Sequence, residues 1–383
     1  MKILFLVSSM NAGGAERVAA TLANAWARRG DSVTLTPTYT NRGSSFYFVS
    51  PAVDLVWLAD RIGSRRFPWL TGFHKWRALR RLIREKQPDL VISFLTNVNV
   101  MTLLSARGLR ARVIVCERTD PAVGATFGPI LAGLRWLTYP WADLVTVQTQ
   151  ASVASFKKMV PGMRALAVIP NPLPPELLDF PAALRGADTN GRRRLMAMGR
   201  LVPAKQFSCL ISAFAELAAS HPDWDLLIWG EGPLRDVLSR QIQEAGLASR
   251  ITLPGRTDAP WRELSQANAF VLTSAIEGFP NVLLEAMAIG LPCIAFDCPS
   301  GPREITRGGQ DALLIPLGDQ KALVRSMNDL LGDADLRDRL ALRALSVRDR
   351  YALPAVLSIW DTVMRQLGVP ARLQAAPTEK HDA

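Results

Sequence analysis

Residues 269–289 read AFVLTSAIEGFPNVLLEAMAI. The run begins with Ala269–Leu272, which has the length and the apolar character of a buried strand. A turn that contains glycine and proline follows, and Asn281–Ile289 then has the composition of a helix. A buried strand that leads directly into a helix is the repeating unit of a parallel sheet covered by helices. The stretch therefore predicts an α/β fold.

The same alternation of short apolar runs and amphipathic segments extends in both directions along the chain. In the second half, the expected strands are Leu195–Met198, Asp225–Trp229, Ile251–Leu253 and Pro292–Phe296, and the expected helices include Phe207–Ala219 and Leu234–Ala245. In the first half, the expected strands are Ile3–Val7, Ser32–Thr36, Leu90–Phe94, Arg112–Cys116 and Asp143–Val147, with a helix over Glu16–Arg29. We therefore predict two doubly wound parallel sheets with a cleft between them, because open parallel sheets bind ligands beyond the carboxyl ends of their strands.

A proline-rich segment, PNPLPP at 170–175, separates the two halves. Proline fixes its own backbone angle and interrupts regular structure, so the segment is expected to act as a stiff connection. We predict one domain over 1–172 and a second over 173–345. Helical character continues over about 323–367, and the polar tail over 370–383 is expected to be disordered.

Composition narrows the class of protein. The 383 residues are 49% hydrophobic and 21% charged, which is typical of a globular chain. The four cysteines form no CxxC pair and only three histidines are present, so neither a disulfide framework nor a Cys/His zinc site is expected. The net charge of +11 indicates an anionic partner, which can be a phosphorylated substrate, an anionic lipid or a nucleic acid.

The chain carries no apolar run near the 18 residues that a membrane-spanning helix needs. The opening run Ile3–Val7 is also shorter than the apolar core of a secretory signal, and a buried first strand explains it better. With the unpaired cysteines, these features predict a cytoplasmic protein.

Two turns that follow expected strands have the chemistry of anion-binding loops. Gly13 and Gly14 precede the first helix, where small residues let the backbone approach an anion, although a plain tight turn has the same pattern. In the loop GRLVPAK at 199–205, Arg200 can bind two phosphate oxygens and Lys205 adds a point charge. This loop suits a diphosphate, with a solvated basic loop as the alternative. The turn GEGP at 230–233 is weaker evidence.

The segment EGFPNVLLE at 277–285 carries the strongest signal. Glu277 precedes the helix, whose N-terminus near Val282 can receive a phosphate. Glu285 lies two turns inside the helix between apolar neighbours, so its carboxylate is expected to be buried rather than solvated. A buried carboxylate needs a cationic or polyhydroxyl partner.

Taken together, these motifs and PSGPREI at 299–305 resemble a retaining glycosyltransferase of family 4, over about residues 1–365. The resemblance implies the GT-B architecture, two Rossmann-like doubly wound domains facing a central cleft, with the acceptor on 1–172 and the nucleotide-sugar donor on 173–345. A C-terminal helix within 346–369 would return to the first domain. The implied donor-binding residues are Gly13, Gly14, Arg200, Lys205, Glu231, Gly278, Phe279, Pro280, Asn281, Val282 and Glu285.

The resemblance also implies individual roles. Arg200 and Lys205 would hold the diphosphate, Glu285 the ribose hydroxyls and Glu277 the sugar hydroxyls. The Gly278–Pro280 backbone would line the sugar, and Gly14 would close over the diphosphate. No DxD-type metal dyad is apparent and the cations can replace a metal, so no metal and no cofactor are expected. No nucleophile is well placed, which fits the same-face attack attributed to this family.

One segment departs from the family pattern. Many relatives carry a histidine after a first-domain strand, where this chain has CERTDP at 116–121. Arg118 stands at the histidine position, and Arg118 and Asp120 become candidates for contact with sugar or acceptor. A capped turn is the alternative. The predicted catalytic set is therefore Glu277, Arg200, Lys205, Arg118 and Asp120.

The segment 61–86 is strongly basic, with nine cations, one acid and interleaved aromatic residues. A cationic amphipathic segment of this kind predicts contact with an anionic membrane surface or a lipid-linked diphosphate, against an ordinary helix with a charged face. The candidate acceptor or membrane residues are Arg65, Arg66, Trp69, Lys75, Trp76, Arg80 and Arg81. Nucleic acid is disfavoured because no nucleic-acid-binding motif is present.

The sequence thus predicts a metal-independent retaining transferase, peripheral on the inner membrane face of a bacterium. It would move a hexose or N-acetylhexosamine from a UDP-linked donor to a lipid-linked or surface-glycan acceptor, in polysaccharide or lipopolysaccharide synthesis. The donor sugar, the linkage and the oligomeric state stay open. The alternatives are a non-hydrolysing nucleotide-sugar epimerase and a non-catalytic protein that binds polyanions or anionic lipid.

Overall fold

The structure is a computed structural model that describes residues 1–39, 44–62, 71–118, 128–180 and 191–369. Contacts divide the chain into a first unit, Met1–Pro172 together with the chain from Pro354 on, and a second unit, Leu173–Leu353. The return to the first unit begins at Pro354 rather than at 346. The tail 370–383 lies outside the described residues.

The first unit contains a seven-stranded sheet in the order β3-β2-β1-β4-β5-β6-β7, and every neighbouring pair is parallel. Its strands are β1 Lys2–Val7, β2 Ser32–Pro37, β3 Asp54–Leu55, β4 Leu90–Phe94, β5 Arg112–Cys116, β6 Leu144–Val147 and β7 Leu166–Val168. The strand order reverses between β1 and β4, and a reversal of this kind marks the position where such sheets bind ligands.

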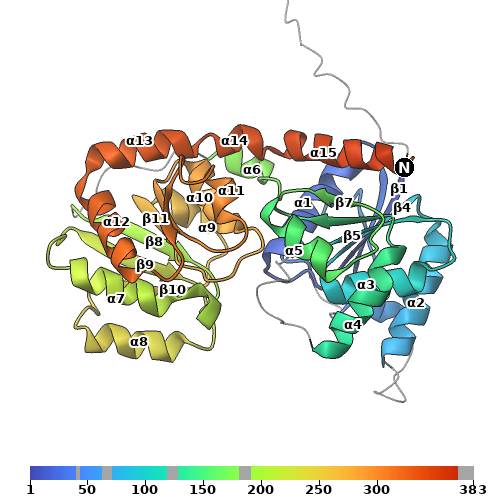
Figure 1. The fold of residues 1–383 in the computed structure, drawn as a ribbon, viewed down its shortest axis with the longest axis horizontal. Coiled ribbons are helices and arrows are strands. Elements are labelled where there is room, and N and C mark those ends of the chain that lie inside the picture. Colours follow the sequence, from blue (N-terminus) through green and yellow to red (C-terminus); the bar gives the residue numbers. More distant parts are fainter. Residues whose placement is uncertain (40–43, 63–70, 119–127, 181–190, 370–383) are drawn as a thin grey trace, which may run out of the picture. The chain divides into compact units, whose positions relative to one another are not determined.

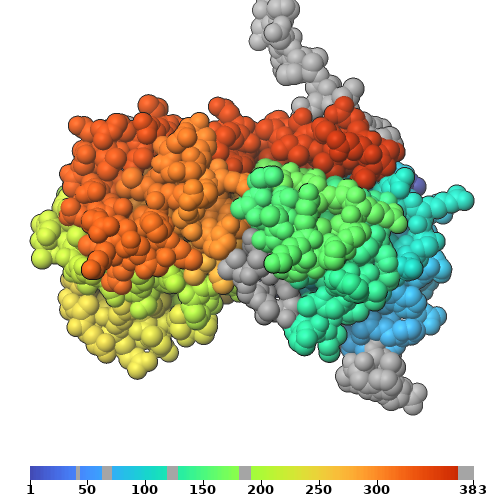
Figure 2. Space-filling view, in the orientation of Figure 1, coloured from blue at the N-terminus to red at the C-terminus, as the bar shows by residue number. Residues whose placement is uncertain are grey.

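Helices cover both faces of this sheet (Figure 1). They are α1 Gly14–Arg28, α2 Thr71–Lys86, α3 Thr96–Ala106, α4 Pro129–Thr138, α5 Ala151–Met159 and α15 Leu353–Gln366, with 3-10 turns at Leu58–Arg61 and Tyr139–Trp141. On one face, Trp26 of α1 packs edge-on against Trp360 of α15 with ring centres 5.5 Å apart. Arg29 and Asp361 form an ion pair at 2.9 Å beside them. The last helix is therefore part of the first unit, and the space-filling view shows it lying along that unit (Figure 2).

The second unit contains a six-stranded parallel sheet in the order β10-β9-β8-β11-β12-β13. Its strands are β8 Arg193–Met198, β9 Trp224–Trp229, β10 Ile251–Gly255, β11 Ala269–Leu272, β12 Cys293–Asp297 and β13 Leu313–Pro316. Its helices are α6 Pro175–Leu178, α7 Phe207–Leu217, α8 Arg235–Glu244, α9 Pro260–Ser265, α10 Asn281–Ile289, α11 Pro302–Ile305, α12 Gln320–Gly332, α13 Ala334–Ala344 and α14 Val347–Arg350, with a 3-10 turn at Pro203–Lys205. The strand order reverses between β8 and β11.

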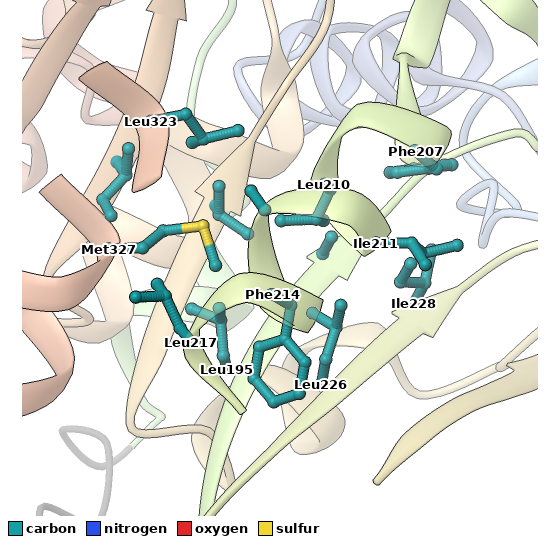
Figure 3. Packing of buried hydrophobic residues seen from close by; sticks show 14 of the residues in the cluster. Leu195, Phe207, Leu210, Ile211, Phe214, Leu217, Leu226, Ile228, Leu323 and Met327 are labelled. Atoms are coloured by element: carbon teal, nitrogen blue, oxygen red, sulfur yellow. The ribbon is translucent and has the colours of Figure 1, made fainter. Parts of the chain in front are cut away.

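The second sheet has an apolar core on each face. Figure 3 shows one of them, in which Phe214 of α7 and Met327 of α12 pack against Leu195 and Leu226 of the sheet. On the other face, α10 buries Leu283 and Met287 in an apolar cluster formed with β11, β12 and neighbouring helices. The apolar character of α10 is explained by this burial, and the strand-turn-helix unit over 269–289 has the predicted bounds.

The predicted class, two Rossmann-like units with doubly wound parallel sheets, is confirmed. The expected helical character over about 323–367 is also present, and it is divided among four helices. The first break falls at Asp333, whose carboxylate accepts a hydrogen bond from the backbone N–H of Leu336 at 2.9 Å and so caps α13.

Candidate functional site

Lys205 and Glu277 meet at the strand reversal of the second unit. Lys205 ends the 3-10 turn that follows β8, and Glu277 lies in the loop that follows β11. The ammonium group of Lys205 forms an ion pair with Oε1 of Glu277, and their side chains are only 19% and 12% exposed. Two residues that stand 72 positions apart in the sequence are thus brought together beyond the carboxyl ends of neighbouring strands, where the fold predicts a ligand site.

Backbone contacts hold these two loops together. The hydroxyl of Thr273 donates to the carbonyl oxygen of Lys205 at 2.9 Å. The N–H of Ala275 donates to the carbonyl oxygen of Ala204 at 2.8 Å. The ion pair therefore rests on a fixed backbone and not on two flexible side chains alone. Arg200, from the same β8 loop, is exposed.

The GEGP turn after β9 packs directly on the β8 loop. A Cβ atom on Gly230 would lie 1.9 Å from the carbonyl oxygen of Gly199, and one on Gly232 would lie 2.4 Å from that of Leu201. The N–H of Leu201 donates to the carbonyl oxygen of Glu231 at 2.9 Å. These glycines are therefore required for close packing of two loops. Glu231 was predicted to bind the nucleotide-sugar donor. Its carboxylate forms an ion pair with Arg235 at 2.9 Å.

The PSGP turn after β12 supports the Gly278–Pro280 backbone in the same way. A Cβ atom on Gly301 would lie 2.4 Å from Cδ of Pro280, and the hydroxyl of Ser300 donates to the carbonyl oxygen of Gly278 at 2.8 Å. Phe279 is buried and packs edge-on against Tyr351 at 5.6 Å between ring centres. The segment that would line the sugar thus has a fixed backbone.

Glu285 is buried inside α10, with 3% of the residue exposed. The indole N–H of Trp261, from α9, donates to its Oε2 at 3.1 Å. Trp261 was not among the sequence-predicted site residues, because nothing in the sequence connects α9 with α10. Asn281 and Val282 begin α10, which has no side-chain cap, and a helix start of this kind favours an anion.

In the first unit, Arg118 is the second residue after β5. Its guanidinium group stacks on the ring of Phe94 at 4.0 Å and donates a hydrogen bond to Oδ1 of Asn171. Gln148 donates to the same oxygen at 2.7 Å. Desolvation lowers the pKa of Arg118 to about 10. Asn171 belongs to the proline-rich connection, which therefore also anchors a side chain and is more than a spacer. Asp120 lies outside the described residues.

A buried carboxyl group beside Arg118 was not predicted from the sequence. Glu117 is 4% exposed, and the hydroxyl of Thr96 donates to its two oxygens at 2.8 and 3.0 Å. The hydroxyl of Tyr139 donates to it as well, and Asn99 donates to the Tyr139 oxygen at 3.0 Å. Burial raises the pKa of Glu117. The only sign of this group in the sequence is that a charged residue directly follows an apolar strand. Its partners Thr96 and Tyr139 come from separate elements, so the hydrogen bonds to it could not be predicted.

This carboxyl group is expected to make the stability of the first unit depend on pH. The folded-state pKa of Glu117 is raised above the ordinary value of 4.5, so its contribution to stability is complete below that value and is lost as the pH rises through the folded-state pKa. We expect the Glu117→Gln variant to lose this dependence and to melt higher than wild type on the alkaline side. Thermal unfolding of both proteins from pH 4.5 upward checks this, and parallel curves would contradict it.

Gly13 and Gly14 lie where α1 begins. A Cβ atom on Gly13 would lie 2.3 Å from Oε2 of Glu16, and the hydroxyl of Ser9 donates to Oε1 of Glu16 at 2.6 Å. Glycine at 13 thus leaves room for the Glu16 carboxylate, whose charge also acts on Arg118. The turn after β1 and the Arg118 region accordingly lie close together at the strand reversal of the first sheet.

The basic segment divides into inward and outward residues. Lys75 lies over the ring of Tyr39 at 3.7 Å. The Trp76 indole donates to the carbonyl oxygen of Leu104 at 3.2 Å, and Arg80 donates to those of Ser105 and Arg107 at 2.8 Å each. Trp76 and Arg80 therefore hold α2 on α3, as the ordinary-helix alternative expected, whereas Arg81 is exposed. Arg65, Arg66 and Trp69 lie outside the described residues.

Two cavities, of about 600 and 550 Å³, lie elsewhere in the first unit, near the beginnings of β4 and β5. They share Leu109–Arg112 and contain none of the predicted catalytic residues. Within the described ranges, no three His, Cys, Asp or Glu side chains gather in a way that could hold a metal ion. No helix of the described chain has both the length and the apolar character needed to cross a bilayer.

Comparison with known proteins identifies the class that this fold and site define. Residues 12–177 match the sequence model for Glycosyltransferase Family 4, and residues 186–346 match that for Glycosyl transferases group 1. The fold matches that of Anabaena Alr3699/HepE, solved in complex with UDP-glucose, with a TM-score of 0.76 at 20% identity, covering 96% of this chain and 99% of that one. The protein is a GT-B glycosyltransferase. The chain belongs to glycosyltransferase family 4.

Two curated relatives illustrate the range of the family. A Streptomyces coelicolor exopolysaccharide phosphotransferase is 30% identical over 96% of this chain, which spans only 41% of that protein. A Campylobacter jejuni α-1,4-N-acetyl-D-galactosaminyltransferase, named for a diphospho-undecaprenol-linked glycan, is 26% identical over 90% of this chain and 92% of its own length.

Proposed function

We propose that this glycosyltransferase is a retaining, metal-independent enzyme. It moves a hexose or N-acetylhexosamine from a UDP-sugar to a lipid-linked or surface-glycan acceptor at the inner membrane face. The proposal covers the synthesis of a bacterial polysaccharide or lipopolysaccharide. The observation that carries it is the Lys205–Glu277 pair at the strand reversal of the second unit.

The pair suits the departure of a nucleoside diphosphate. As the bond between the sugar carbon and the diphosphate breaks, negative charge develops on the phosphate oxygens, and a cation already fixed there stabilises it. Lys205 supplies that cation and Arg200 a second one from the same loop. Glu277, held by Lys205, receives the sugar hydroxyls, and Glu285 the ribose hydroxyls. The two cations perform the neutralising role that a metal ion has in other transferases.

Retention follows from attack on the face that the diphosphate leaves. The acceptor oxygen forms the new bond to the sugar carbon, and its proton moves to a departing phosphate oxygen. This route needs no enzyme nucleophile, and the Glu277 carboxylate is engaged by Lys205. In the first unit, Arg118 contacts the sugar or the acceptor, positioned by Phe94 and Asn171.

The proposed acceptor is supported by a relative, and the proposed membrane location by the positive charge of the chain. The Campylobacter relative is named for a diphospho-undecaprenol acceptor, which is a membrane lipid. The exposed cations of α2 and the net charge of +11 suit an anionic surface.

Nucleotide-dependent thermal stability is the direct test. We expect UDP to raise the unfolding temperature more than GDP, ADP or NAD does, since a ligand at about 100 times its dissociation constant adds roughly 2.7 kcal/mol to the native state. The shift disappears in Lys205→Ala and persists in Lys321→Ala, an exposed lysine of the same unit. If only another nucleotide stabilised the protein, the donor would carry that nucleotide and the proposed UDP-sugar would be wrong.

A UDP-sugar panel with added acceptors then separates the alternatives. Transfer to an acceptor supports the proposal, whereas epimerisation without any acceptor supports a nucleotide-sugar epimerase. Binding to duplex DNA or vesicles without nucleotide binding or turnover supports a non-catalytic polyanion-binding protein.

A further inference from the structure

Helix α4, over Pro129–Thr138, exposes large apolar side chains and buries its one charged residue. Ile130, Trp136 and Leu137 are 80%, 57% and 52% exposed, while Arg135, the only charged residue of the helix, is 6% exposed. A helix that packs on a sheet ordinarily buries its apolar face and exposes its charges. Helix α4 does pack Leu131 and Leu134 against the core of the first unit, but it also buries its one charge and exposes three large apolar side chains. Packing within the first unit therefore does not explain its outward face.

The rotation of α4 is fixed by its inward residues. The Arg135 guanidinium lies 5.9 Å from the ring of Phe156 and donates a hydrogen bond to the sulfur of Met159, both on α5. Its charge acts on the buried Glu117 and Tyr139. Turning the apolar face inward would move Arg135 away from these partners.

The outward face of α4 forms one uncharged stripe. Its exposed residues are Pro129, Ile130, Ala132, Gly133, Trp136 and Leu137. The spacing of Ile130, Gly133 and Leu137 is that of a single helix face. A contiguous exposed apolar surface on a folded domain indicates a partner.

Exposed cations lie on two other helices of the first unit, α2 and α5. Helix α2 contacts α3, and α3 contacts α4, and Figure 1 shows the three helices at the same end of the first unit. Arg77, Arg81 and Arg84 of α2 are exposed with helical spacing, and Phe73 is 52% exposed beside them. On α5, Lys157 and Lys158 are exposed.

We propose that α4 is the element that enters an anionic lipid surface, and that the exposed arginines of α2 and lysines of α5 contact the headgroups. The inference rests on the membrane location given under the proposed function, and it names α4 as a further membrane-binding segment beside the basic helix α2. Tryptophan and branched aliphatic residues between cations match the headgroup zone, where aromatic rings sit and anionic phosphates lie. A protein partner would need acidic groups around an apolar groove. An anionic bilayer presents charged headgroups above an apolar interior over its whole surface.

Vesicle flotation of the full chain tests the assignment. The vesicles contain phosphatidylethanolamine with or without phosphatidylglycerol. We expect Trp136→Ser and Leu137→Ser each to lower partition onto the anionic vesicles about tenfold, the equivalent of one lost apolar side chain. The matched control Leu342→Ser, 69% exposed on α13 of the second unit, leaves partition unchanged. High salt weakens wild-type binding but preserves the ratio between wild type and the α4 variants, because their lost contribution is apolar.

Three results would overturn the inference. They are wild-type partition of the α4 variants, equal partition of wild type onto vesicles with and without phosphatidylglycerol, and a protein dimer that Trp136→Ser dissociates. The nucleotide test distinguishes a failure of this inference from a failure of the proposed function. UDP-dependent stabilisation and transfer to a short water-soluble acceptor do not involve α4, so both should persist in the α4 variants. Retained UDP stabilisation in the α4 variants also shows that they are folded.

Discussion

Replacing Lys205 with alanine is expected to lower kcat/KM for the sugar-nucleotide donor by about 10²- to 10³-fold, the usual effect of removing one fixed group that stabilises developing charge. The side chain is 19% exposed and is positioned by its pair with Glu277, so water replaces it poorly. Because the charge on the diphosphate grows as the glycosidic bond breaks, most of the loss should fall on kcat. Steady-state kinetics with varied donor concentration measure the two constants separately.

Two control variants sharpen this experiment. Lys321→Ala removes an exposed lysine from α12 of the same unit and should leave both constants unchanged. Lys205→Arg keeps the charge and should recover part of the activity, less than fully because the guanidinium group has a different shape. A Lys205→Ala enzyme with wild-type kcat would remove Lys205 from the transfer step, and the Lys205–Glu277 pair would then be structural.

The sheets were predictable because their strands are buried and sharply bounded. Leu90–Phe94, Arg112–Cys116 and Ala269–Leu272 have the predicted bounds, since each is a short apolar run between polar turns. The two-residue strand β3 and the half-buried β7 have no such pattern. Their pairing depends on the neighbouring strand already being in place, which a local sequence window does not contain.

The positions of the β8 and β11 loops were predictable because these loops follow strand ends in the sequence. Lys205 and Glu277 were each proposed from their own loop, but their direct pairing depends on β8 and β11 being neighbours in the sheet. Glu285 was expected to be buried from its apolar neighbours, and its partner Trp261 was not foreseen. Long-range hydrogen bonds of this kind arise from tertiary packing and leave no spacing signature.

Helix α4 illustrates the opposite limit. Its sequence, PILAGLRWLT, is almost entirely apolar and would ordinarily predict a buried helix with an exposed arginine. In the structure the arginine is buried and part of the apolar surface is exposed, because Glu117, which follows β5, supplies a carboxyl group and α5 supplies an aromatic ring near Arg135. An arrangement of this kind depends on neighbours that a helical period does not encode, and such exceptions to local rules are where function is expected.

Replacing Gly230 with alanine is expected to destabilise the second unit by more than about 3 kcal/mol, beyond the usual range for overpacking. The added Cβ atom would lie 1.9 Å from the carbonyl oxygen of Gly199. That oxygen belongs to the backbone of the β8 loop, so no side-chain rotation relieves the contact. Calorimetric unfolding should show the loss as a lower transition temperature for the second unit, with the first unit unchanged.

The control separates this contact from backbone strain. Gly246 also has a positive φ, +69° against +141° for Gly230, but a Cβ atom there would meet nothing within 4 Å. Gly246→Ala should therefore cost only about 1–2 kcal/mol, the ordinary penalty for a left-handed alanine. Equal losses in the two variants would mean that the close approach of the loops does not matter. A larger loss at Gly230, with weaker UDP binding at temperatures where the variant is still folded, would show that the β9 turn positions the loop that carries Arg200 and Lys205.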